Sequence, residues 1–569
     1  MTAIGRAGSG FVGRESELAE LEAALGDAVE GRGRLVLISG EPGIGKSRLA
    51  AELVRQAQAR GIVVLSGRCW EAGGAPPYWP WVQALRPLVR ELPAHRLASH
   101  LGEGGPDVAQ MLPEIRSALP DLAEPPSLDS DAARFQLFDS TAQFLLRAAR
   151  DEPMVLVLDD LHSADVPSLL LLRFVAPELS RAHVLVVATW RTGEMGIEHP
   201  LAEAVADVLR LPATRRLELA GFSERDVAAF VESTAGVTPS PQQVAAIRGE
   251  TEGNPLFVQE VVRLLASEGM LEQVGRGTSL PAIPQGVREV IGRRLLHISD
   301  ECTRVLTLAA VLGREFTLEA LRRMSELAAD DLLEVLEEAV SARVVEDVPG
   351  SLGWLRFSHV LIRDVLYEDV SGTQRLRLHR RAGTVLEELY RADPTPHLAE
   401  LAHHFAQAAP AGEWAKAVEY ARRAGDQAVD QLAYEEAVRV YGIALQALDL
   451  EPSAEEETRC DLLLALGDAQ ARAGGLGARE TFVAAADLAQ RLGRPQALAK
   501  AALGYGGRFT WSRAAGDARI VPLLEAARAA LGERDDPLLV QVLGRLSCAL
   551  RDRHEREPRW TLSRLAVAM

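Results

Sequence analysis

The stretch GEPGIGKS at residues 40–47 constrains this chain more than any other, because it matches the pattern GxxxxGK[ST] over its full length. A short apolar run, LVLIS at residues 35–39, precedes it, and RLAAELVRQAQAR follows with the spacing of a helix that ends at Gly61. A strand, a glycine loop and a helix in this order are what a phosphate-binding loop requires. The sequence therefore predicts a P-loop NTPase domain of the α/β class with a parallel sheet. The alternative interpretation is a glycine-rich turn without a ligand.

The residue types in the loop fit the chemistry of a bound polyphosphate. Gly40, Gly43 and Gly45 permit backbone conformations in which successive amides point at phosphate oxygens, while the helix N-terminus adds its positive end. We expect Lys46 to reach the β and γ phosphates and the Ser47 hydroxyl to ligate Mg²⁺. ATP or ADP and Mg²⁺ are thus the predicted cofactors. The predicted loop contacts are Gly40, Glu41, Pro42, Gly43, Ile44, Gly45, Lys46, Ser47 and Arg48.

Lys46 is one of three lysines, with Lys416 and Lys500, in a chain whose lysines and arginines together number 62. A genome-wide coding bias accounts for the excess of arginine. An arginine fork is too large and planar for the cleft between phosphates, whereas an ammonium is a compact charge on a flexible stem. The retained lysine therefore agrees with a phosphate-binding role.

Two further apolar runs predict strands that end in polar side chains. Residues 154–158 (MVLVL) lead into Asp159 and Asp160, and residues 184–188 (VLVVA) lead towards Arg191. Asp159 is expected to hold Mg²⁺ through water, Asp160 to polarise the attacking water and Arg191 to sense the γ-phosphate. The catalytic candidates are therefore Lys46, Asp160 and Arg191, and the metal candidates are Ser47 and Asp159. A solvated turn or helix N-cap for the acids, and a surface arginine, are the alternatives.

The composition and net charge of the chain limit the kinds of partner that it is expected to bind. A length of 569 residues favours about four domains, and a net charge of −18 with a pI near 5.3 argues against a broad grip on nucleic acid or an anionic membrane. The four cysteines show no metal-binding spacing. No apolar run has the length of a membrane span or the form of a signal peptide, so we expect a cytoplasmic protein without membrane contact.

The middle of the chain predicts a helical region. LELA at residues 217–220 has the character of a last core strand, and GFSERDVAAFVEST follows as the start of a helical lid. Residues 286–330 predict successive amphipathic helices, GVREVIGRRLLHIS, ECTRVLTLAAVLG and FTLEALRRMS.

A hairpin closes this helical region. After DDLLEVLEEAVSA, the short apolar runs at residues 343–348 and 352–357 flank Pro349-Gly350-Ser351. Helices closed by a hairpin predict a winged helix. The helix at residues 330–342 is acidic, the wrong charge for a DNA groove, so we interpret the module as regulatory.

The last third reads as successive helices with short polar joints. Small and aromatic residues recur, as in Trp414 to Ala421, Ala433 to Ala444 and Leu466 to Ala485, and match tetratricopeptide repeats loosely. A generic helical domain is the alternative. The adjacent His403 and His404 point about 100° apart on a helix and have no further ligand cluster, so no metal site is predicted there.

Five segments follow from these signals. They are a flexible N-terminus at residues 1–10, a P-loop nucleotide-binding domain at 11–220, a helical lid at 221–285, a winged-helix-like regulatory domain at 286–372 and a tetratricopeptide-like all-α domain at 373–569.

Five motifs occur in an order that resembles a known family. They are FVGRESELAELEAAL, GEPGIGKSRLAAEL, MVLVLDDLHSAD, VVATWR and TEGNPLFVQEV. Together they resemble the STAND class of AAA-type signal-transduction ATPases, and within it the large LuxR-type transcriptional regulators, from about Phe11 to at least Leu448. The chain departs from the family at Ser163, where an aromatic residue is frequent.

The resemblance implies further nucleotide contacts. Val12, Gly13 and Arg14 would lie near the adenine, Pro255 would pack on the base from the lid, and His359 would reach the β-phosphate of ADP. The alternatives are a helix N-terminal turn for the first three, an ordinary helix start for Pro255, and a capping or core-edge role for His359.

The expected function is a nucleotide-dependent switch with slow ATP hydrolysis, acting in transcriptional regulation. ADP would hold the lid and winged helix closed, and an inducer or protein partner at the helical repeats would permit exchange to Mg·ATP, with nucleotide-dependent self-association as a further expectation. The alternatives are the sensory portion of a cyclase-like or kinase-like protein, an origin-recognition-like ATPase that loads onto DNA, and a scaffold with structural nucleotide. No helix-turn-helix is visible, so DNA binding is not expected within this chain, which is either truncated or signals through a partner.

Overall fold

The computed structural model describes residues 11–70, 74–125, 130–192, 199–267, 291–292, 295, 298–348, 351–451, 456–475, 477–507, 517–532, 536–550 and 556–569. The predictions for residues 1–10, for most of 268–297 and for Pro349 and Gly350 lie outside this part of the chain. The chain divides into two compact units, the first ending at Leu389 and the second built mainly from Tyr390 onwards.

A five-stranded parallel sheet forms the centre of the first unit. Its strands are β1 (Arg34–Gly40), β2 (Val63–Arg68), β3 (Met154–Asp159), β4 (Val184–Arg191) and β5 (Thr214–Glu218), in the order β2-β3-β4-β1-β5. The predicted parallel α/β fold is confirmed, with β1, β3 and β4 at their predicted runs.

Strand β5 corrects one boundary. It spans Thr214–Glu218 rather than the predicted residues 217–220, and pairs in parallel with β1. Of its five residues only Leu217 is buried. An edge strand with one apolar side chain gives little signal in sequence, which explains the shift. The strand β2 was not predicted.

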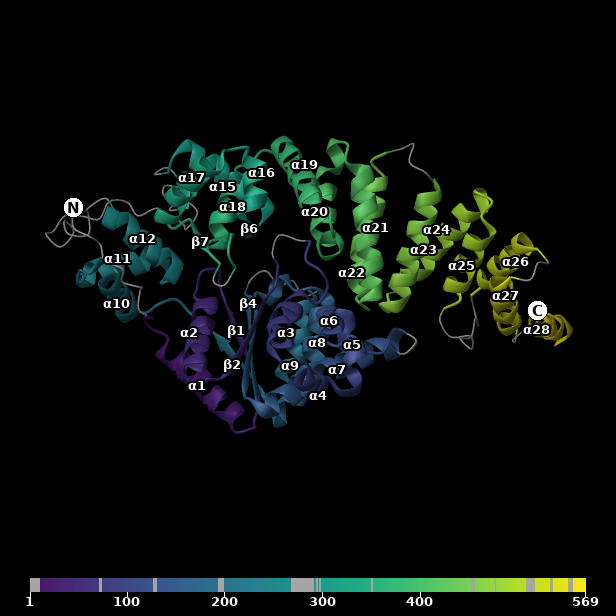
Figure 1. Cartoon of the computed structure of the whole chain (residues 1–569), viewed down its shortest axis with the longest axis horizontal. Coiled ribbons are helices and arrows are strands. Elements are labelled where there is room, and N and C mark those ends of the chain that lie inside the picture. Colours follow the sequence, from purple (N-terminus) through teal and green to yellow (C-terminus); the bar gives the residue numbers. More distant parts are fainter. Residues whose placement is uncertain are drawn as a thin grey trace. The chain divides into compact units, whose positions relative to one another are not determined.

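Helices cover both faces of the sheet (Figure 1). α1 (Glu15–Val29) and α2 (Lys46–Ala59) bury apolar side chains against one face of β1, β3 and β4. The other face carries helices from the long β2–β3 connection and from the β3–β4 and β4–β5 connections. These helices are α3 (Trp79–Glu91), α4 (Ala94–Leu101), α5 (Gly105–Met111), α6 (Glu114–Ala118), α7 (Ser130–Asp151), α8 (Val166–Val175) and α9 (Pro200–Leu209).

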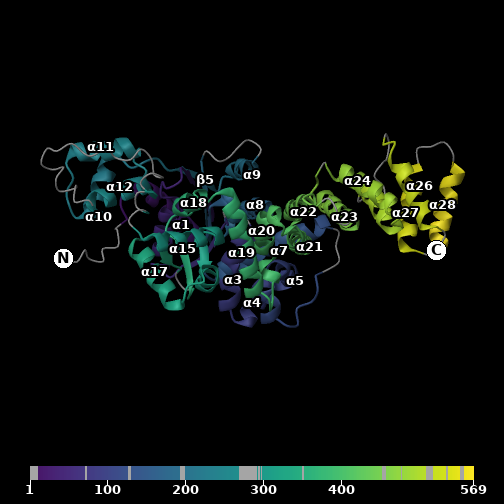
Figure 2. The same cartoon turned by 90° about the horizontal axis from the view of Figure 1, so that it is seen from above.

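Three helices after the sheet pack together as a small cluster with a shared apolar core, and they are labelled in Figure 2. They are α10 (Glu224–Ala235), α11 (Pro241–Thr251) and α12 (Pro255–Ser267). Capping boxes at Ser223 and Ser240 begin the first two helices, because each serine accepts a backbone N–H while the third helical residue caps in return.

A second sheet lies further along the first unit. It has three antiparallel strands in the order β6-β8-β7, and the predicted hairpin is present as β7 paired with β8. Phe316 and Thr317, predicted to begin a helix, belong instead to β6, which is too short for a periodic signal. We call residues 298–348 and 351–370 the β6–β8 module. Its elements are α15 (Asp300–Leu312), β6 (Glu315–Thr317), α16 (Leu318–Ser325), α17 (Ala329–Ser341), β7 (Val345–Asp347), β8 (Trp354–Phe357) and α18 (Val360–Glu368); α19 (Gly372–Leu389) follows.

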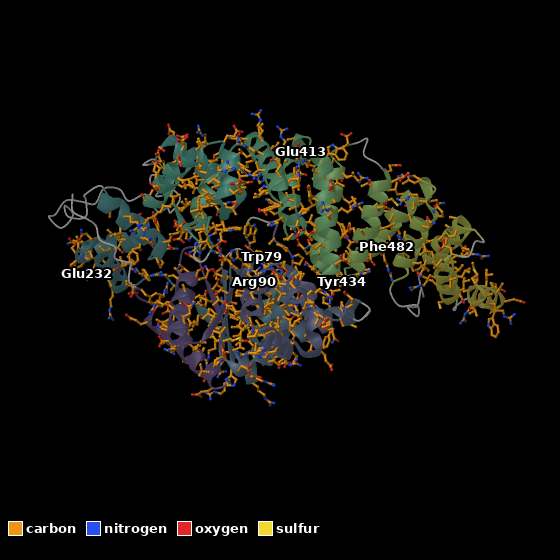
Figure 3. All side chains as sticks on the ribbon, viewed as in Figure 1. Trp79, Arg90, Glu232, Glu413, Tyr434 and Phe482 are labelled. Carbon is orange, nitrogen blue, oxygen red and sulfur yellow. The ribbon has the colours of Figure 1, made fainter. Side chains whose placement is uncertain are left out.

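The second unit consists of successive packed helices, as predicted for a largely helical C-terminal region. Its ring-to-glycine contacts set the helix spacing: Phe482, labelled in Figure 3, lies against Gly467 and Gly504, and Tyr441 lies against Gly425. The helices are α20 (Leu398–Ala408), α21 (Trp414–Asp430), α22 (Tyr434–Leu448), α23 (Glu456–Arg472), α24 (Ala478–Arg491), α25 (Pro495–Tyr505), α26 (Ile520–Leu531), α27 (Pro537–Ala549) and α28 (Arg556–Ala568). Within the described part of the chain, no helix has the length and apolar character to traverse a bilayer.

Candidate functional site

The glycine loop joins β1 to α2 at the carboxyl edge of the parallel sheet. Gly43 and Gly45 have φ values of 80° and 102°, in the left-handed region that favours glycine. Gly43 also has no space for a side chain, because an added Cβ would lie 2.9 Å from the Asn254 amide oxygen. The loop therefore takes the backbone course that its sequence predicts.

Lys46 is the first residue of α2 and is 6% exposed. Its Nζ atom donates hydrogen bonds to the carbonyl oxygens of Gly40 at 2.9 Å and Glu41 at 2.8 Å. The ammonium thus lies inside the loop, bound to backbone oxygens that a phosphate oxygen would replace as acceptors. The contact of this ammonium with the β and γ phosphates stays a prediction.

Ser47 and Asp159 lie in contact across the sheet edge. The Ser47 hydroxyl donates to Asp159 Oδ1 at 3.0 Å, although 112 positions separate them in sequence. A hydroxyl and a carboxylate are hard oxygen donors of the kind that Mg²⁺ prefers. The donor set therefore fits a magnesium ion.

Thr189 completes this arrangement and was not predicted. It lies near the end of β4, and its hydroxyl donates to Asp159 Oδ1 at 2.5 Å while it accepts from the backbone N–H of Asp160 at 2.9 Å. A polar residue in the otherwise apolar run VVATW was its only signal in sequence. Thr189 fixes both acids relative to β4.

The Asp160 side chain is held by ion pairs with arginines. Its backbone is left-handed, with φ 61° and ψ 45°, which is unfavourable for a residue with a Cβ. Its Oδ2 atom accepts hydrogen bonds from Arg68 Nε at 3.0 Å and Nη2 at 2.5 Å. Arg314 of the β6–β8 module lies 3.7 Å from the same oxygen. In this conformation that oxygen is engaged by arginines, whereas the sequence predicts an acid that polarises water.

Arg68 was missed because β2 was not predicted. It is the last residue of β2 and lies opposite Asp159 in the strand register. Its position at a strand end, in LSGRCW, was the available signal.

The neighbouring Cys69 shows how buried this edge is. Burial, followed by the nearby carboxylates of Asp165, Asp160 and Asp159, raises the pKa of its thiol well above the usual value. The thiol therefore stays protonated near neutral pH.

Arg191 ends β4 and lies opposite Gly40 in the register of β1. The next residue, Thr192, donates its N–H to the Gly40 carbonyl at 3.1 Å. Arg191 lines the same cavity as the glycine loop. The structure thus places it at the strand edge that the sequence predicts.

Arg14 connects three segments. Its guanidinium donates to the Ile44 carbonyl at 3.2 Å and to the Ala220 carbonyl, and pairs with Glu17 at 3.0 Å. Its charge also lies 5.5 Å from the centre of the Phe222 ring. Arg14 and Val12 line the cavity, whereas Gly13 faces Asp226 of α10. In this structure Arg14 therefore ties the N-terminal segment to the glycine loop.

The turn before α12 binds the glycine loop directly. The Asn254 amide donates to the Pro42 carbonyl at 2.9 Å, and the Leu256 N–H donates to the Gly43 carbonyl at 3.2 Å. Pro255 lines the cavity, and the resemblance predicts that it packs on the base. Asn254 was not predicted as a contact, although it is the single asparagine in the chain.

His359 caps α18. Its Nδ1 atom accepts the backbone N–H of Leu361 at 3.2 Å, which matches the alternative of a capping histidine. The residue also lines the cavity. The two roles are compatible, because the cap uses one ring nitrogen.

All these segments surround one cavity of about 1420 Å³. Nine arginines and lysines line it against five acids, although the whole chain has a net charge of −18. The cations come from the segment before α1, the sheet edge with the glycine loop and α2, the helix α12 and the β6–β8 module. Such a concentration of positive charge favours a polyanionic ligand. The cationic residues are Arg14, Lys46, Arg48, Arg68, Arg191, Arg263, Arg314, Arg343 and Arg356.

Comparison with known proteins agrees with this geometry for the first part of the chain. Residues 10–187 match the family model described as an AAA ATPase domain. This range contains the glycine loop and both acids, and such a domain implies the use of nucleotide and Mg²⁺.

The chain is also similar to longer and more distant proteins. An uncharacterized protein of Rhizobium meliloti (strain 1021) is 27% identical over 414 residues, which cover 68% of this chain and 38% of that protein. The chain thus spans less than half the length of this relative.

Among solved structures, a STAND protein with a tetratricopeptide repeat sensor from Pyrococcus horikoshii is 14% identical, with 98% of this chain and 76% of that one covered and a TM-score of 0.44. The Orc1 protein of Aeropyrum pernix in complex with DNA is 15% identical, with 65% and 96% covered and a TM-score of 0.29. Both scores are too low to carry an argument about function.

Proposed function

We propose that this chain is a nucleotide-dependent signalling switch of the STAND class, with slow ATP hydrolysis, that acts in transcriptional regulation like the LuxR-type regulators it resembles. The observation that carries the proposal is the cation-lined cavity, because it is bounded by the glycine loop, the lid and the β6–β8 module at once. A ligand there contacts parts that a switch must move relative to one another.

The chain's own residues define the binding role. The backbone of Gly40–Arg48 and the Lys46 ammonium would hold the phosphates, and Ser47 and Asp159 would hold Mg²⁺. Bound nucleotide and Mg²⁺ supply the polyphosphate charge and the Lewis acid. Arg191 at the sheet edge and His359 of the module are the proposed γ-phosphate and β-phosphate contacts, and Val12, Gly13, Arg14 and Pro255 the proposed base contacts.

We assign a role to each of three groups of elements. The cluster of α10, α11 and α12 serves as the lid, and the β6–β8 module as a winged helix that regulates rather than reads DNA. Its helix α17 carries five acids over Ala329–Ser341, which opposes contact with phosphates of DNA. The helices from α20 onwards serve as a tetratricopeptide-like sensor for an inducer or protein partner, in a cytoplasmic protein.

A switch needs ligands that distinguish two states. Moving the equilibrium from 1:99 to 99:1 takes about 5.5 kcal/mol of differential binding. Lys46, Arg191 and the magnesium ligands are the proposed source, because they respond to a γ-phosphate that ADP lacks.

Hydrogen–deuterium exchange tests this proposal. Saturating Mg·ATP and Mg·ADP are expected to give different exchange rates at the amides of β6, β7 and β8, with little difference in the core strands β3 and β4. Identical exchange in the two nucleotides, with both shown to bind, would contradict the switch and leave a scaffold with structural nucleotide.

A further inference from the structure

Arg314 of the β6–β8 module forms an ion pair with Asp160, the second acid of the site. It stands between α15 and β6, and its backbone is fixed, because its carbonyl accepts the N–H of Phe357 at 2.9 Å. Its Nη1 atom lies 3.7 Å from Asp160 Oδ2, and its Nε atom is buried with no hydrogen-bond partner within the described residues. The guanidinium is thus held near Asp160 by one ion pair.

Asp160 meets this arginine from a strained backbone. A left-handed conformation is unfavourable at a residue with a side chain, and it persists where surrounding contacts determine it. Here Thr189 binds the Asp160 N–H and Arg68 binds its Oδ2 atom. The acid is therefore held with its Oδ2 atom towards the two arginines.

Arg68 and Arg314 are held in place by different parts of the structure. Arg68 belongs to the sheet, where its N–H donates to Gln83 of α3 at 2.7 Å and Gly67 lies directly against the Pro80 carbonyl. Arg314 belongs to another part of the first unit, and its contact exists only while the β6–β8 module lies at the sheet edge. Arg68 is thus a constant partner of Asp160 and Arg314 a conditional one.

We propose that Arg314 is a positioning residue that adds a second ion pair to Asp160 while the β6–β8 module is docked, and so slows ATP hydrolysis. An Oδ2 atom shared by two guanidinium groups has less capacity to accept a hydrogen bond from an attacking water. Withdrawal of the module removes one of the two charges and favours release of the acid. This inference rests on the proposed function, because it assigns a regulation to the same nucleotide site.

We expect loss of the Arg314–Asp160 ion pair to have a moderate effect on the rate of ATP hydrolysis. The Arg314 side chain is 21% exposed and that of Asp160 7%, so the pair is partly screened by solvent. Arg68 also remains in place after Arg314 is removed. We expect a three- to tenfold change in rate, about the effect of 0.7–1.4 kcal/mol.

Steady-state ATPase kinetics of the full chain test the inference. Arg314→Ala should raise kcat about three- to tenfold with KM for ATP unchanged within about twofold. Arg314→Lys, which keeps the charge without the fork, should lie between wild type and Arg314→Ala. Arg323→Ala is the matched control, because Arg323 belongs to α16 of the same module, pairs with Glu319 at 2.6 Å and is not among the residues that line the cavity.

A second readout tests whether Arg314 acts through Asp160. Arg314→Ala should increase amide exchange in β6 and β8 in the wild-type background and have no further effect in the Asp160→Asn background. This comparison is made without nucleotide, so it tests the pairing of Arg314 with Asp160 separately from the rate of ATP hydrolysis, and an absence of hydrolysis with this pairing intact would refute the proposed function and not the pairing.

The opposing results are distinct. A lower kcat in Arg314→Ala would show that Arg314 assists the reaction, and a kcat equal to that of Arg323→Ala would show that the ion pair has no effect on the reaction. An exchange increase of equal size in the Asp160→Asn background would show that Arg314 acts elsewhere. Each of these results overturns the inference.

Discussion

The sheet edge of the first unit and the helical core of the second unit use their residues in different ways. At the sheet edge, charged and hydroxyl side chains from distant segments meet, as in Ser47 with Asp159 and Arg68 with Asp160. In the second unit, glycines lie against aromatic rings, as at Gly504 and Phe482, and the core is apolar. We therefore expect substitutions at the sheet edge to alter ligand binding or catalysis with little effect on the stability of the fold. Substitutions in the helical core should lower stability with little effect on the ligand site.

The largest expected effect concerns Asp159. Asp159→Ala removes the carboxylate of the proposed magnesium site, and ATP hydrolysis should fall by at least about 100-fold, because a metal ion contributes several kcal/mol to stabilising the transition state. Steady-state phosphate release measures the rate. The control is Asp151→Ala, which removes an acid that pairs with Arg96 on the surface. Wild-type activity in Asp159→Ala would show that this carboxylate at the sheet edge has no role in catalysis.

The second prediction concerns the helical core. A methyl group at Gly504 would overlap the Phe482 ring, so Gly504→Ala should destabilise the second unit by about 1–3 kcal/mol through overpacking. Gly442→Ala is the matched control, because nothing lies within 4 Å of its added Cβ and alanine favours the helix. Urea denaturation measures both. A lower ATP affinity in a folded Gly504→Ala variant would show that the helical core also affects the ligand site, which would contradict the expected difference between the two regions.

The third prediction concerns the contact between the turn before α12 and the glycine loop. Asn254→Asp keeps an oxygen that can cap the Leu256 N–H but loses the amide donor to the Pro42 carbonyl. One hydrogen bond is worth about 1 kcal/mol, so ATP affinity should fall about fivefold. Titration calorimetry measures the affinity. Ser240→Ala, which uncaps the neighbouring helix α11, should leave it unchanged.

The smallest expected effect concerns Cys69. Burial and nearby carboxylates raise its pKa, and only the thiolate reacts, so alkylation by iodoacetamide at pH 8 should be slower at Cys69 than at the half-buried Cys548. Its rate should keep rising with pH beyond the ordinary range of a cysteine. Mass spectrometry of the labelled peptides measures both rates. Equal rates would show that the sheet edge is more open than the structure indicates.

Sequence predicts the parts of the site that depend on local pattern. Apolar runs identify β1, β3 and β4, and spacing identifies Lys46, Ser47 and both acids. Sequence reasoning fails where the contacting residues come from distant parts of the chain. Arg68 and Thr189 matter because parallel strands bring their ends together, and Arg314 matters because the β6–β8 module lies at that edge.

The same reasoning explains the errors in the elements. β5 has one buried residue and β6 has three residues in all, so neither offers a periodic apolar signal. The predicted role of Asp160 also depended on local pattern. The structure adds the arginines, and with them a reason for the acid to be held in a strained conformation.

The most direct test of the account is nucleotide binding by Lys46→Ala, measured by titration calorimetry with Mg·ATP and Mg·ADP. The Lys46 ammonium lies inside the glycine loop, so its loss should weaken both nucleotides by at least about 100-fold, or about 2.7 kcal/mol. Lys500→Ala, which removes an exposed lysine of α25, should bind both as the wild type does. Tight nucleotide binding by a folded Lys46→Ala variant would contradict the account.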